Sequence, residues 1–353
     1  MTSPPGKTFH IPALDGIRAV SIAVVFVAHA GAGTVVPGGF GVTVFFFLSG
    51  FLISTLLRKE FERHQAISFK NFYIRRALRI FPPFYAALAF AVLMLLAGLL
   101  PGKLEWSGVG LLAAHLGNYA QVYWGESALP PGTAVYWSLA VEEHYYLTFP
   151  FVALLLLKRN SRRTTVVALT LIGIAILVWR IYLVNQGAPE VRTYLATDTR
   201  VDSILWGCLL ALTLNPVMDR PLATSTAAEA AVLIASLAVL LFCFVYRDAA
   251  FRETYRYTLQ GIALLPVFYL AVLRSHWPVF RWLDWRPVRY IGTLSYTLYL
   301  VHLVVLYSLE YCLPQVPTLV RGVAGAAIST GMAALSYHYM ERPLARLRKK
   351  YSE

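Results

Sequence analysis

Residues 14–31 read LDGIRAVSIAVVFVAHAG, an apolar run that also carries Asp15, Arg18 and His29. A helix needs about 20 mainly apolar residues to cross the roughly 30 Å of hydrocarbon in a membrane. Similar runs recur along the 353-residue chain, which is 58% hydrophobic and 14% charged, whereas a soluble domain has about 25% charged residues. The sequence therefore predicts an all-α, polytopic integral membrane bundle.

Proline, glycine and charge clusters divide the chain into ten expected spans. The spans are expected near residues 13–33, 38–58, 79–100, 141–157, 164–184, 199–214, 228–246, 257–273, 290–311 and 318–340. The first apolar run lacks a basic leader followed by a cleavage site, so we expect it to remain as a span. One transmembrane domain covering residues 1–353, with no appended soluble domain, is the expectation.

The net charge of +13 fits this topology better than a nucleic-acid-binding protein. Most Lys and Arg residues fall in alternate short connections, such as residues 58–79 and 158–163, and such loops face the cytoplasm. We therefore expect both termini in the cytoplasm and no nucleic-acid partner. The three cysteines show no CxxC spacing, which argues against a disulfide framework or a metal site.

Three arginines are candidates for an anion site at the cytoplasmic end of the bundle. The segment RRALR puts Arg76 and Arg79 on one helix face, since residues three apart are neighbours on a helix. Arg18 is expected at the same level. The planar donor fork of arginine suits phosphate, so the three together could bind a polyphosphate. The alternative is that they only orient the chain in the membrane.

The first span places His29 on the same stripe as Arg18, about 16 Å further along the helix. The segment YWSLAVEEHYYLTFP carries Glu142 and Glu143. Both are expected at the outer end of the fourth span, at about the same depth in the membrane as His29. One carboxylate could hold the imidazole in a single tautomer, as suits a general base. Ser138 shares the face of Glu142. Two interfacial acids at a helix start are the alternative.

Other polar groups in the spans are weaker candidates for substrate contact. Asp202 follows Arg200 in TRVDSILWG, where an ion pair is as good an explanation as substrate binding. The segment LSYTLYLVH forms a polar stripe of Ser295, Tyr299 and His302, although such stripes also join helices in a bundle. The glycines and serines of the second span, among them Ser49, indicate close helix packing and no catalytic role.

Seven segments taken together resemble the membrane-bound acyltransferase family 3, whose members modify bacterial surface sugars and some small molecules. They run in family order from Ile11 to Arg348. The segments are LDGIRAVSIAVVFVAHAG, GVTVFFFLSGFLIS, FYIRRALRIFPPFY, YWSLAVEEHYYLTFP, TRVDSILWG, LSYTLYLVHLVV and ERPLARLR.

This resemblance implies ten core spans and transfer of an acyl group from cytoplasmic acyl-CoA. The family's motifs fall on Arg18 with His29, Arg76 with Arg79, and Glu142 with Glu143. The chain departs from the family in having Ala28 where an aromatic residue often stands and His144 where glutamine is commoner. Neither departure removes a proposed catalytic group.

The function expected from these patterns is that of an O-acyltransferase in the bacterial inner membrane. Acetyl-CoA or another acyl-CoA would be the donor, no metal would take part, and a sugar-containing hydroxyl compound would be the acceptor. His29 would act as general base with Glu142 or Glu143 behind it, while Arg18, Arg76 and Arg79 bind the donor. Substrate contacts are expected from Asp15, Ser138, Asp202, Ser295, Tyr299 and His302. Membrane lipid is the surrounding partner. The alternatives are a transporter or flippase for a polysaccharide precursor, or a non-catalytic assembly subunit.

Overall fold

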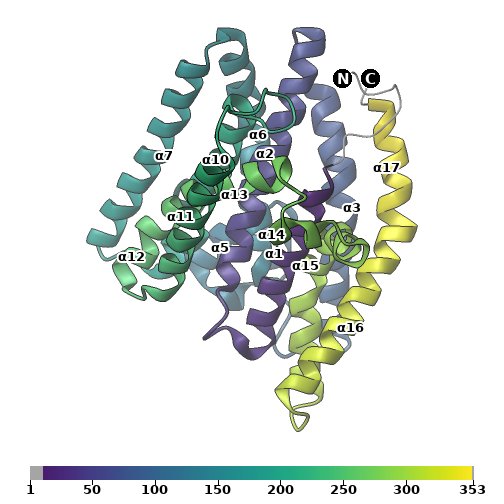
Figure 1. The fold of residues 1–353 in the computed structure, drawn as a ribbon. Coiled ribbons are helices and arrows are strands. Elements are labelled where there is room, and N and C mark those ends of the chain that lie inside the picture. The colour runs from purple at the N-terminus through teal and green to yellow at the C-terminus, as the bar shows by residue number, and fades with distance from the viewer. Residues whose placement is uncertain (1–10, 352–353) are drawn as a thin grey trace.

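The computed structural model describes residues 11–351, and every regular element in that range is a helix (Figure 1). The expectation of an all-α polytopic membrane bundle is thus confirmed. The expected domain bounds at residues 1 and 353 lie outside the described residues.

The long helices form a bundle in which consecutive spans run up and down (Figure 1). They are α1 (Pro12–Val27), α2 (Gly38–His64), α3 (Phe69–Leu96), α6 (Trp137–Arg159), α7 (Arg162–Asn185), α11 (Thr226–Val245), α13 (Tyr255–Leu273), α15 (Arg286–Cys312) and α16 (Thr318–Ser336). A π-helical turn, η5 (Tyr337–Glu341), joins α16 to α17 (Arg342–Arg348).

Shorter helices connect and cap the bundle. They are η1 (Ala28–Ala32), α4 (Trp106–Ala113), α5 (Gly117–Trp124), η2 (Glu126–Ala128), η3 (Ala134–Tyr136), α8 (Glu190–Leu195), α9 (Thr197–Arg200), α10 (Asp202–Thr213), α12 (Ala249–Glu253), α14 (Pro278–Arg281), η4 (Trp282–Asp284) and η6 (Lys349–Tyr351).

Eight helices in the described part of the chain are long and apolar enough to cross a membrane. The two further spans expected from the sequence correspond to α6 and α10. Helix α6 has 23 residues but carries the two glutamates. Helix α10 has 12 residues, which gives a length of about 18 Å, too short to cross alone. The expected number of ten spans is therefore not confirmed.

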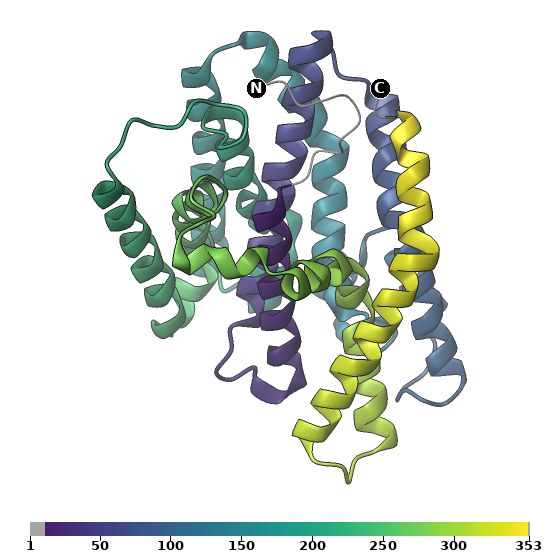
Figure 2. The same cartoon turned by 45° about the vertical axis from the view of Figure 1, so that its right-hand side comes forward.

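The two ends of the bundle can be told apart by their turns (Figures 1 and 2). The α2–α3 turn, the α6–α7 turn and the end of α17 lie at the top, and the α15–α16 turn lies at the bottom. At the top, Arg75 donates to the carbonyl oxygen of Tyr351 and pairs with Glu60. This contact holds the C-terminal helix against α3.

Close packing of α2 against α10 depends on glycine. A Cβ added to Gly50 would lie 2.0 Å from the carbonyl oxygen of Ile204, and one added to Gly207 would lie 2.0 Å from that of Phe47. Both distances are far below van der Waals contact, so only glycine permits this separation of the helices. The close packing expected on the second span is confirmed at Gly50.

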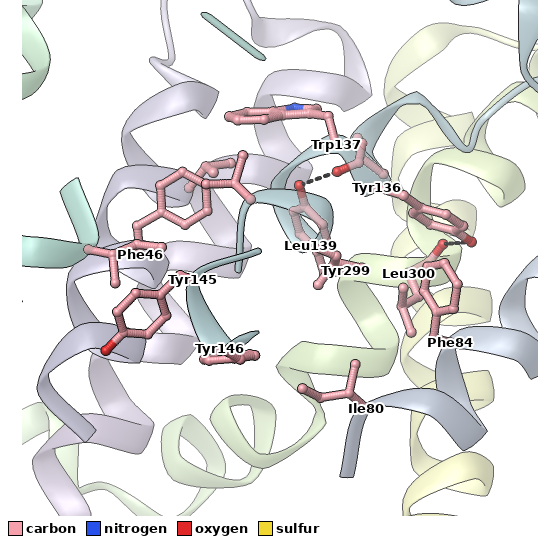
Figure 3. Close-up of a cluster of buried hydrophobic side chains, with 14 of the residues drawn as sticks. Phe46, Ile80, Phe84, Tyr136, Trp137, Leu139, Tyr145, Tyr146, Tyr299 and Leu300 are labelled. Carbon is pink, nitrogen blue, oxygen red and sulfur yellow. Dashed lines mark hydrogen bonds between the residues drawn. The ribbon is translucent and has the colours of Figure 1, made fainter. Parts of the chain in front are cut away.

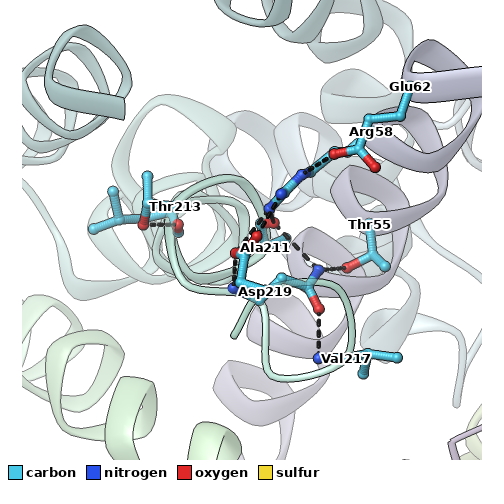
Figure 4. A network of polar contacts seen from close by, with 9 residues as sticks. Thr55, Arg58, Glu62, Ala211, Thr213, Val217 and Asp219 are labelled. Carbon is cyan, nitrogen blue, oxygen red and sulfur yellow. Dashed lines mark hydrogen bonds and ion pairs between the residues drawn. The ribbon is translucent and has the colours of Figure 1, made fainter. Parts of the chain in front are cut away.

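A polar network fixes the top end of α2 to the loop after α10 (Figure 4). Arg58 donates to Asp219 at 2.9 Å, and the amide of Asn215 donates to Thr55 at 2.8 Å. Burial opposes ionisation of Asp219, but hydrogen bonds from Arg58 and from the backbone N–H of Asn215 outweigh it. The pKa of Asp219 therefore lies below its ordinary value.

Helix α6 begins among buried side chains, including those of Tyr136 and Trp137 (Figure 3). The segment before it packs against α15, where a Cβ on Gly132 would lie 2.6 Å from the Cα of Val304. Tyr136, 2% exposed, donates from its hydroxyl to the carbonyl oxygen of Leu300 at 2.9 Å. This buried start sets the depth of every polar side chain on α6.

Candidate active site

One cavity of about 290 Å³, the central cavity, lies among α1, α2, α3, α6 and α15. Its apolar wall comes largely from leucine, isoleucine and phenylalanine side chains. Its polar lining consists of Asp15, Arg18, Ser49, Arg76, Arg79, Ser138, Glu142, Glu143, Tyr146, Ser295, Tyr296 and Tyr299. The helices thus bring most of the residues singled out in the sequence to one cavity.

The three arginines expected to act together line this one cavity. Arg18 donates to Asp15 at 2.7 Å. Arg76 has a buried Nε without a hydrogen-bond partner, and the exposed Arg79 makes no hydrogen bond or ion pair with any described residue. Buried polar groups are normally hydrogen-bonded, so a cavity with an unpartnered guanidinium is suited to an anionic ligand.

Arg75 behaves differently from its neighbour, since it contacts Glu60 and the Tyr351 carbonyl and does not line the cavity. Arg348 of α17 adds a further positive charge near Arg76 and Arg79. The segment containing Arg348 belongs to the family resemblance, yet sequence reasoning did not assign this residue to the site.

The two glutamates lie at the level of the arginines. Glu142 accepts hydrogen bonds from Ser49 at 3.0 Å and from the Tyr146 hydroxyl at 2.9 Å. One oxygen of Glu143, Oε1, is buried without a hydrogen-bond partner. The expected contact between these glutamates and His29 is absent from the described residues.

The depth of α6 explains this correction. Because α6 begins inside the bundle, Glu142 lies deeper than a residue at a membrane surface. Its partner Ser49 is about 16 Å along α2 from Gly38, whereas His29 lies in η1, at the end of the bundle opposite the α2–α3 turn. The prediction that Glu142 shares the depth of His29 was therefore wrong.

His302 is the residue that contacts His29. Its Nδ1 lies 2.7 Å from the carbonyl oxygen of Tyr299, and its Nε2 lies 3.2 Å from His29 Nδ1. A carbonyl oxygen only accepts, so Nδ1 of His302 must carry the proton and donate. In neutral His302 the Nε2 atom is then an acceptor, and Nδ1–H of His29 donates to it. This pairing leaves Nε2 of His29 as the basic nitrogen.

The histidine pair lies beyond one end of the central cavity and does not line it. Tyr299 forms the link, because it lines the cavity and its ring centroid is 5.7 Å from that of His302. The Tyr299 hydroxyl (Figure 3) donates to the carbonyl oxygen of Val135 at 2.8 Å. The same hydroxyl lies 2.8 Å from the Ser138 hydroxyl. His29 itself is exposed on the η1 turn.

Asp202 lies outside this site. It is fully buried and pairs with Arg180 through two hydrogen bonds of 2.9 and 2.8 Å, and Thr258 also donates to it. The expected substrate contact is therefore wrong. Asp202 does form an ion pair, as the alternative expected, but its partner is Arg180. Arg200 lies against aromatic rings instead.

Sequence reasoning missed three hydroxyl groups of the site, those of Ser49, Tyr146 and Tyr296. Ser49 was assigned to helix packing, yet it donates to Glu142. Tyr146 stands four residues after Glu142 and shares its helix face, so this spacing was a signal that could have found it. Among the described residues no group of three or more His, Cys, Asp or Glu could hold a metal ion.

A comparison with known families identifies the chain. The family model described as an acyltransferase domain matches residues 11–338, which is nearly all of the chain. The chain belongs to this acyltransferase family, and the resemblance found in its motifs is confirmed.

Curated relatives cover almost the whole chain. It is 30% identical to the peptidoglycan O-acetyltransferase OatA of Listeria monocytogenes over 359 residues, which covers 96% of this chain and 56% of that protein. It is 28% identical to the O-acetyltransferase OatA of Staphylococcus aureus, with 96% and 57% covered. A putative peptidoglycan O-acetyltransferase of Bacillus subtilis, YrhL, is also 28% identical, with 96% and 56% covered.

The chain spans just over half the length of these relatives. No solved structure matches it.

Proposed function

We propose that this chain transfers an acyl group, with acetyl as the default, from acyl-CoA to a hydroxyl of a cell-envelope glycan. Peptidoglycan is the first acceptor to consider, because it appears in the names of two relatives. The observation that carries the proposal is the gathering of Arg18, Arg76 and Arg79 in one cavity that leads through Tyr299 to the histidine pair.

The donor is expected to bind with its phosphates against the arginines. Guanidinium groups make strong, directional hydrogen bonds to phosphate, and Arg76 has a donor free to do so. The apolar wall, which includes Leu48, Leu52 and Leu139, suits the pantetheine arm. The rise from Arg18 to His29 is about 16 Å, of the order that such an arm can span.

His29 is the proposed general base. Its Nε2 takes the proton of the acceptor hydroxyl while the hydroxyl oxygen attacks the thioester carbonyl. The C–S bond then breaks, the ester remains on the acceptor, and the sulfur leaves with a proton as coenzyme A. His302 acts as a positioning residue, because it accepts the hydrogen bond from Nδ1 of His29 and so holds the reactive tautomer.

Glu142 and Glu143 are assigned to the donor end of the cavity. Their carboxylates face the arginines and would keep the guanidinium groups in place before the donor binds. Ser295 lines the same cavity and is seven residues before His302, about 10 Å along α15. Ser295 is therefore proposed to contact the donor. It is too far from His29 to stabilise the negative oxygen that forms when the acceptor hydroxyl attacks the thioester carbonyl.

The proposed setting is the bacterial cytoplasmic membrane, with the arginine end of the cavity facing the cytoplasm. The basic α2–α3 and α6–α7 turns lie at one end of the bundle, and such turns face the cytoplasm. In this orientation His29 lies toward the outer side, where an envelope glycan is found.

Equilibrium binding of acetyl-CoA to the detergent-purified chain tests the donor site. Arg76→Gln should weaken binding about tenfold or more, because a hydrogen bond to a charged group contributes about 1.5–3 kcal/mol. Arg75→Gln is the matched control and should bind like the wild type, since Arg75 is outside the cavity. His29→Gln should bind acetyl-CoA normally and release no acceptor-dependent thiol.

Two results would contradict the proposal. Equal loss of binding in Arg75→Gln and Arg76→Gln would show that the cavity does not select the donor. Absence of any acetyl-CoA binding by the wild type would favour the transporter alternative.

A further inference from the structure

A second cavity of about 250 Å³, the outer cavity, lies at the end of α2 opposite the basic turns. Arginine and aromatic side chains dominate its wall. It is lined by residues 33–40 together with Glu190, Tyr194, Cys243, Phe244, Arg247, Arg252, Arg256, Tyr257 and Gln260. The mechanism proposed above uses none of these residues.

The charge of the outer cavity is positive. Three arginines line it, against the single carboxylate of Glu190. The side chain of Arg247 donates only to the carbonyl oxygen of Thr34, and no hydrogen bond or ion pair joins the guanidinium of Arg252 to a described residue. Of the three, Arg256 alone has an acidic neighbour, Glu253 at 3.6 Å.

Two polar side chains that line this cavity have donor groups without partners. The side chain of Gln260 is on a residue that is 3% exposed, and it makes no hydrogen bond with any described residue. Nε of Arg256 is buried and also unpartnered. Because a buried amide or guanidinium is normally hydrogen-bonded, both groups indicate a site for a ligand that accepts hydrogen bonds.

The position of the outer cavity relates it to the reaction. Its lining begins at Gly33, four residues after His29. Tyr194 and Tyr257 line the outer cavity and contact the buried guanidinium of Arg200, which also contacts Phe46 of the central cavity. Arg200 is therefore in contact with aromatic side chains of both cavities.

The arginines are not explained by membrane topology. They lie near α12, at the end of α7 opposite the α6–α7 turn (Figure 1), where the rule of basic cytoplasmic loops predicts few cations. A cationic cavity at that end instead favours binding of an anion from the outer side.

We propose that the outer cavity binds an anionic group of the acceptor, either a carboxylate or a phosphate, and so holds the acceptor hydroxyl near His29. This inference rests on the proposed acyl transfer and names the acceptor class as a negatively charged glycan. Arg247, Arg252 and Arg256 supply the charge-assisted hydrogen bonds, and Gln260 donates its amide N–H. Both phosphate groups and carboxylates are acceptors for these donors.

Binding of defined probes to the detergent-purified chain tests the outer cavity without turnover. Muramyl dipeptide provides a carboxylate, undecaprenyl phosphate provides a phosphate, and chitotetraose is the neutral control. We expect at least one anionic probe to bind, more weakly as salt rises, while chitotetraose binds at least tenfold more weakly. The anionic probe that binds identifies the source of the charge.

Variants locate the binding. Arg252→Gln and Arg247→Gln should each weaken binding of the anionic probe severalfold to tenfold and leave acetyl-CoA binding unchanged. Arg321→Gln removes the same charge at the same end of the bundle but outside the cavity, so it should bind like the wild type. Because Arg247 is exposed, its substitution tests the site even if a buried change affects folding.

The failures of the two proposals are distinguishable. Equal affinity for neutral and anionic probes, or wild-type affinity in both Arg252→Gln and Arg247→Gln, would overturn the outer site while acetyl-CoA binding remained. If the wild type does not bind acetyl-CoA at all, the proposed acyl transfer is refuted instead.

Discussion

At the scale of single residues, the proposed role of His29 as general base depends on its hydrogen bond to His302. His302→Phe keeps a buried ring but removes the acceptor for Nδ1–H of His29. A positioned general base contributes about 10²–10⁴-fold to the rate, and misorientation of His29 forfeits part of this, so we expect kcat to fall about 10- to 100-fold while the KM for acetyl-CoA stays unchanged. Steady-state kinetics measures both values.

Two comparisons separate positioning from damage to the fold. His302→Gln should recover part of the activity, because the amide oxygen can accept the same hydrogen bond. His338→Phe, on the exposed η5 turn, should have no effect. A KM that rises with unchanged kcat in His302→Phe would show that His302 binds donor and does not orient His29.

His115, between α4 and α5, makes stability depend on pH. It stacks against Phe81 and Phe84, and burial, aided by the nearby His144, lowers its pKa to about 4. The unfolded chain binds this proton near pH 6.5. Stability should therefore be complete above about pH 6.5 and decline as the pH falls toward 4.

Melting temperatures measured between pH 7.5 and 4.5 check this expectation. His115→Asn should reduce the decline, and asparagine tolerates the positive φ of 55° at this position. Parallel curves for the wild type and the variant would refute the role of His115.

The residue scale also shows what spacing predicts. The three-residue interval between Arg76 and Arg79 fixed their shared face, and the structure brings both to one cavity with Arg18. Spacing did not identify Arg180 as the partner of Asp202, because the two residues are on different helices. Neighbouring helices are chosen by tertiary packing, which a single sequence leaves open.

At the scale of helices, glycine sets the distance between α2 and α10. Gly207→Ala would place a Cβ 2.0 Å from the Phe47 carbonyl oxygen, and overpacking of this kind typically costs 1–3 kcal/mol, occasionally more. We expect a clear fall in melting temperature. Gly331→Ala on α16 meets nothing within 4 Å and should leave the melting temperature unchanged or raise it slightly. Equal effects of the two variants would contradict the packing argument.

The helix scale explains the incorrect depth of Glu142. Helical periodicity correctly predicts that Ser138 and Glu142 share a face, and both line the central cavity. It contains no information on where the helix begins relative to the membrane. The buried segment from Gly132 to Tyr136 moves the start of α6 inward, and only tertiary contacts with α15 reveal it.

At the scale of the whole molecule, the proposed orientation rests on the charge pattern of the turns. Cys312 is exposed at the end of α15 away from the basic turns, while Cys208 and Cys243 are buried. A membrane-impermeant maleimide should therefore label intact spheroplasts at Cys312, and Cys312→Ser should abolish this labelling. Ser161→Cys, placed in the α6–α7 turn of the Cys312→Ser chain, should react only after permeabilisation. The reverse pattern would invert the topology and place the arginines outside.

Whole-chain composition predicted the membrane bundle but not its number of spans. Hydropathy and length identify eight described helices as candidate membrane spans. Helices α6 and α10 instead depend on neighbouring helices, which bury the carboxylates of both and surround the short α10. The buried pair of Arg180 and Asp202 illustrates this dependence, because the cost of each charge is removed only when α7 and α10 meet. Hydropathy along the sequence does not distinguish α6 and α10 from ordinary spans.

The most direct test of the account is photolabelling of the purified chain with an acyl-CoA analogue that carries a diazirine in its acyl group. Peptide mapping should find the label on residues that line the central cavity near Tyr299, on α2, α6 or α15, and excess acetyl-CoA should suppress it. Arg76→Gln should reduce the labelling, and Arg75→Gln should not. Label confined to lipid-facing helices such as α7 or α11, or label that acetyl-CoA fails to suppress, would contradict the claim that the central cavity is the donor site.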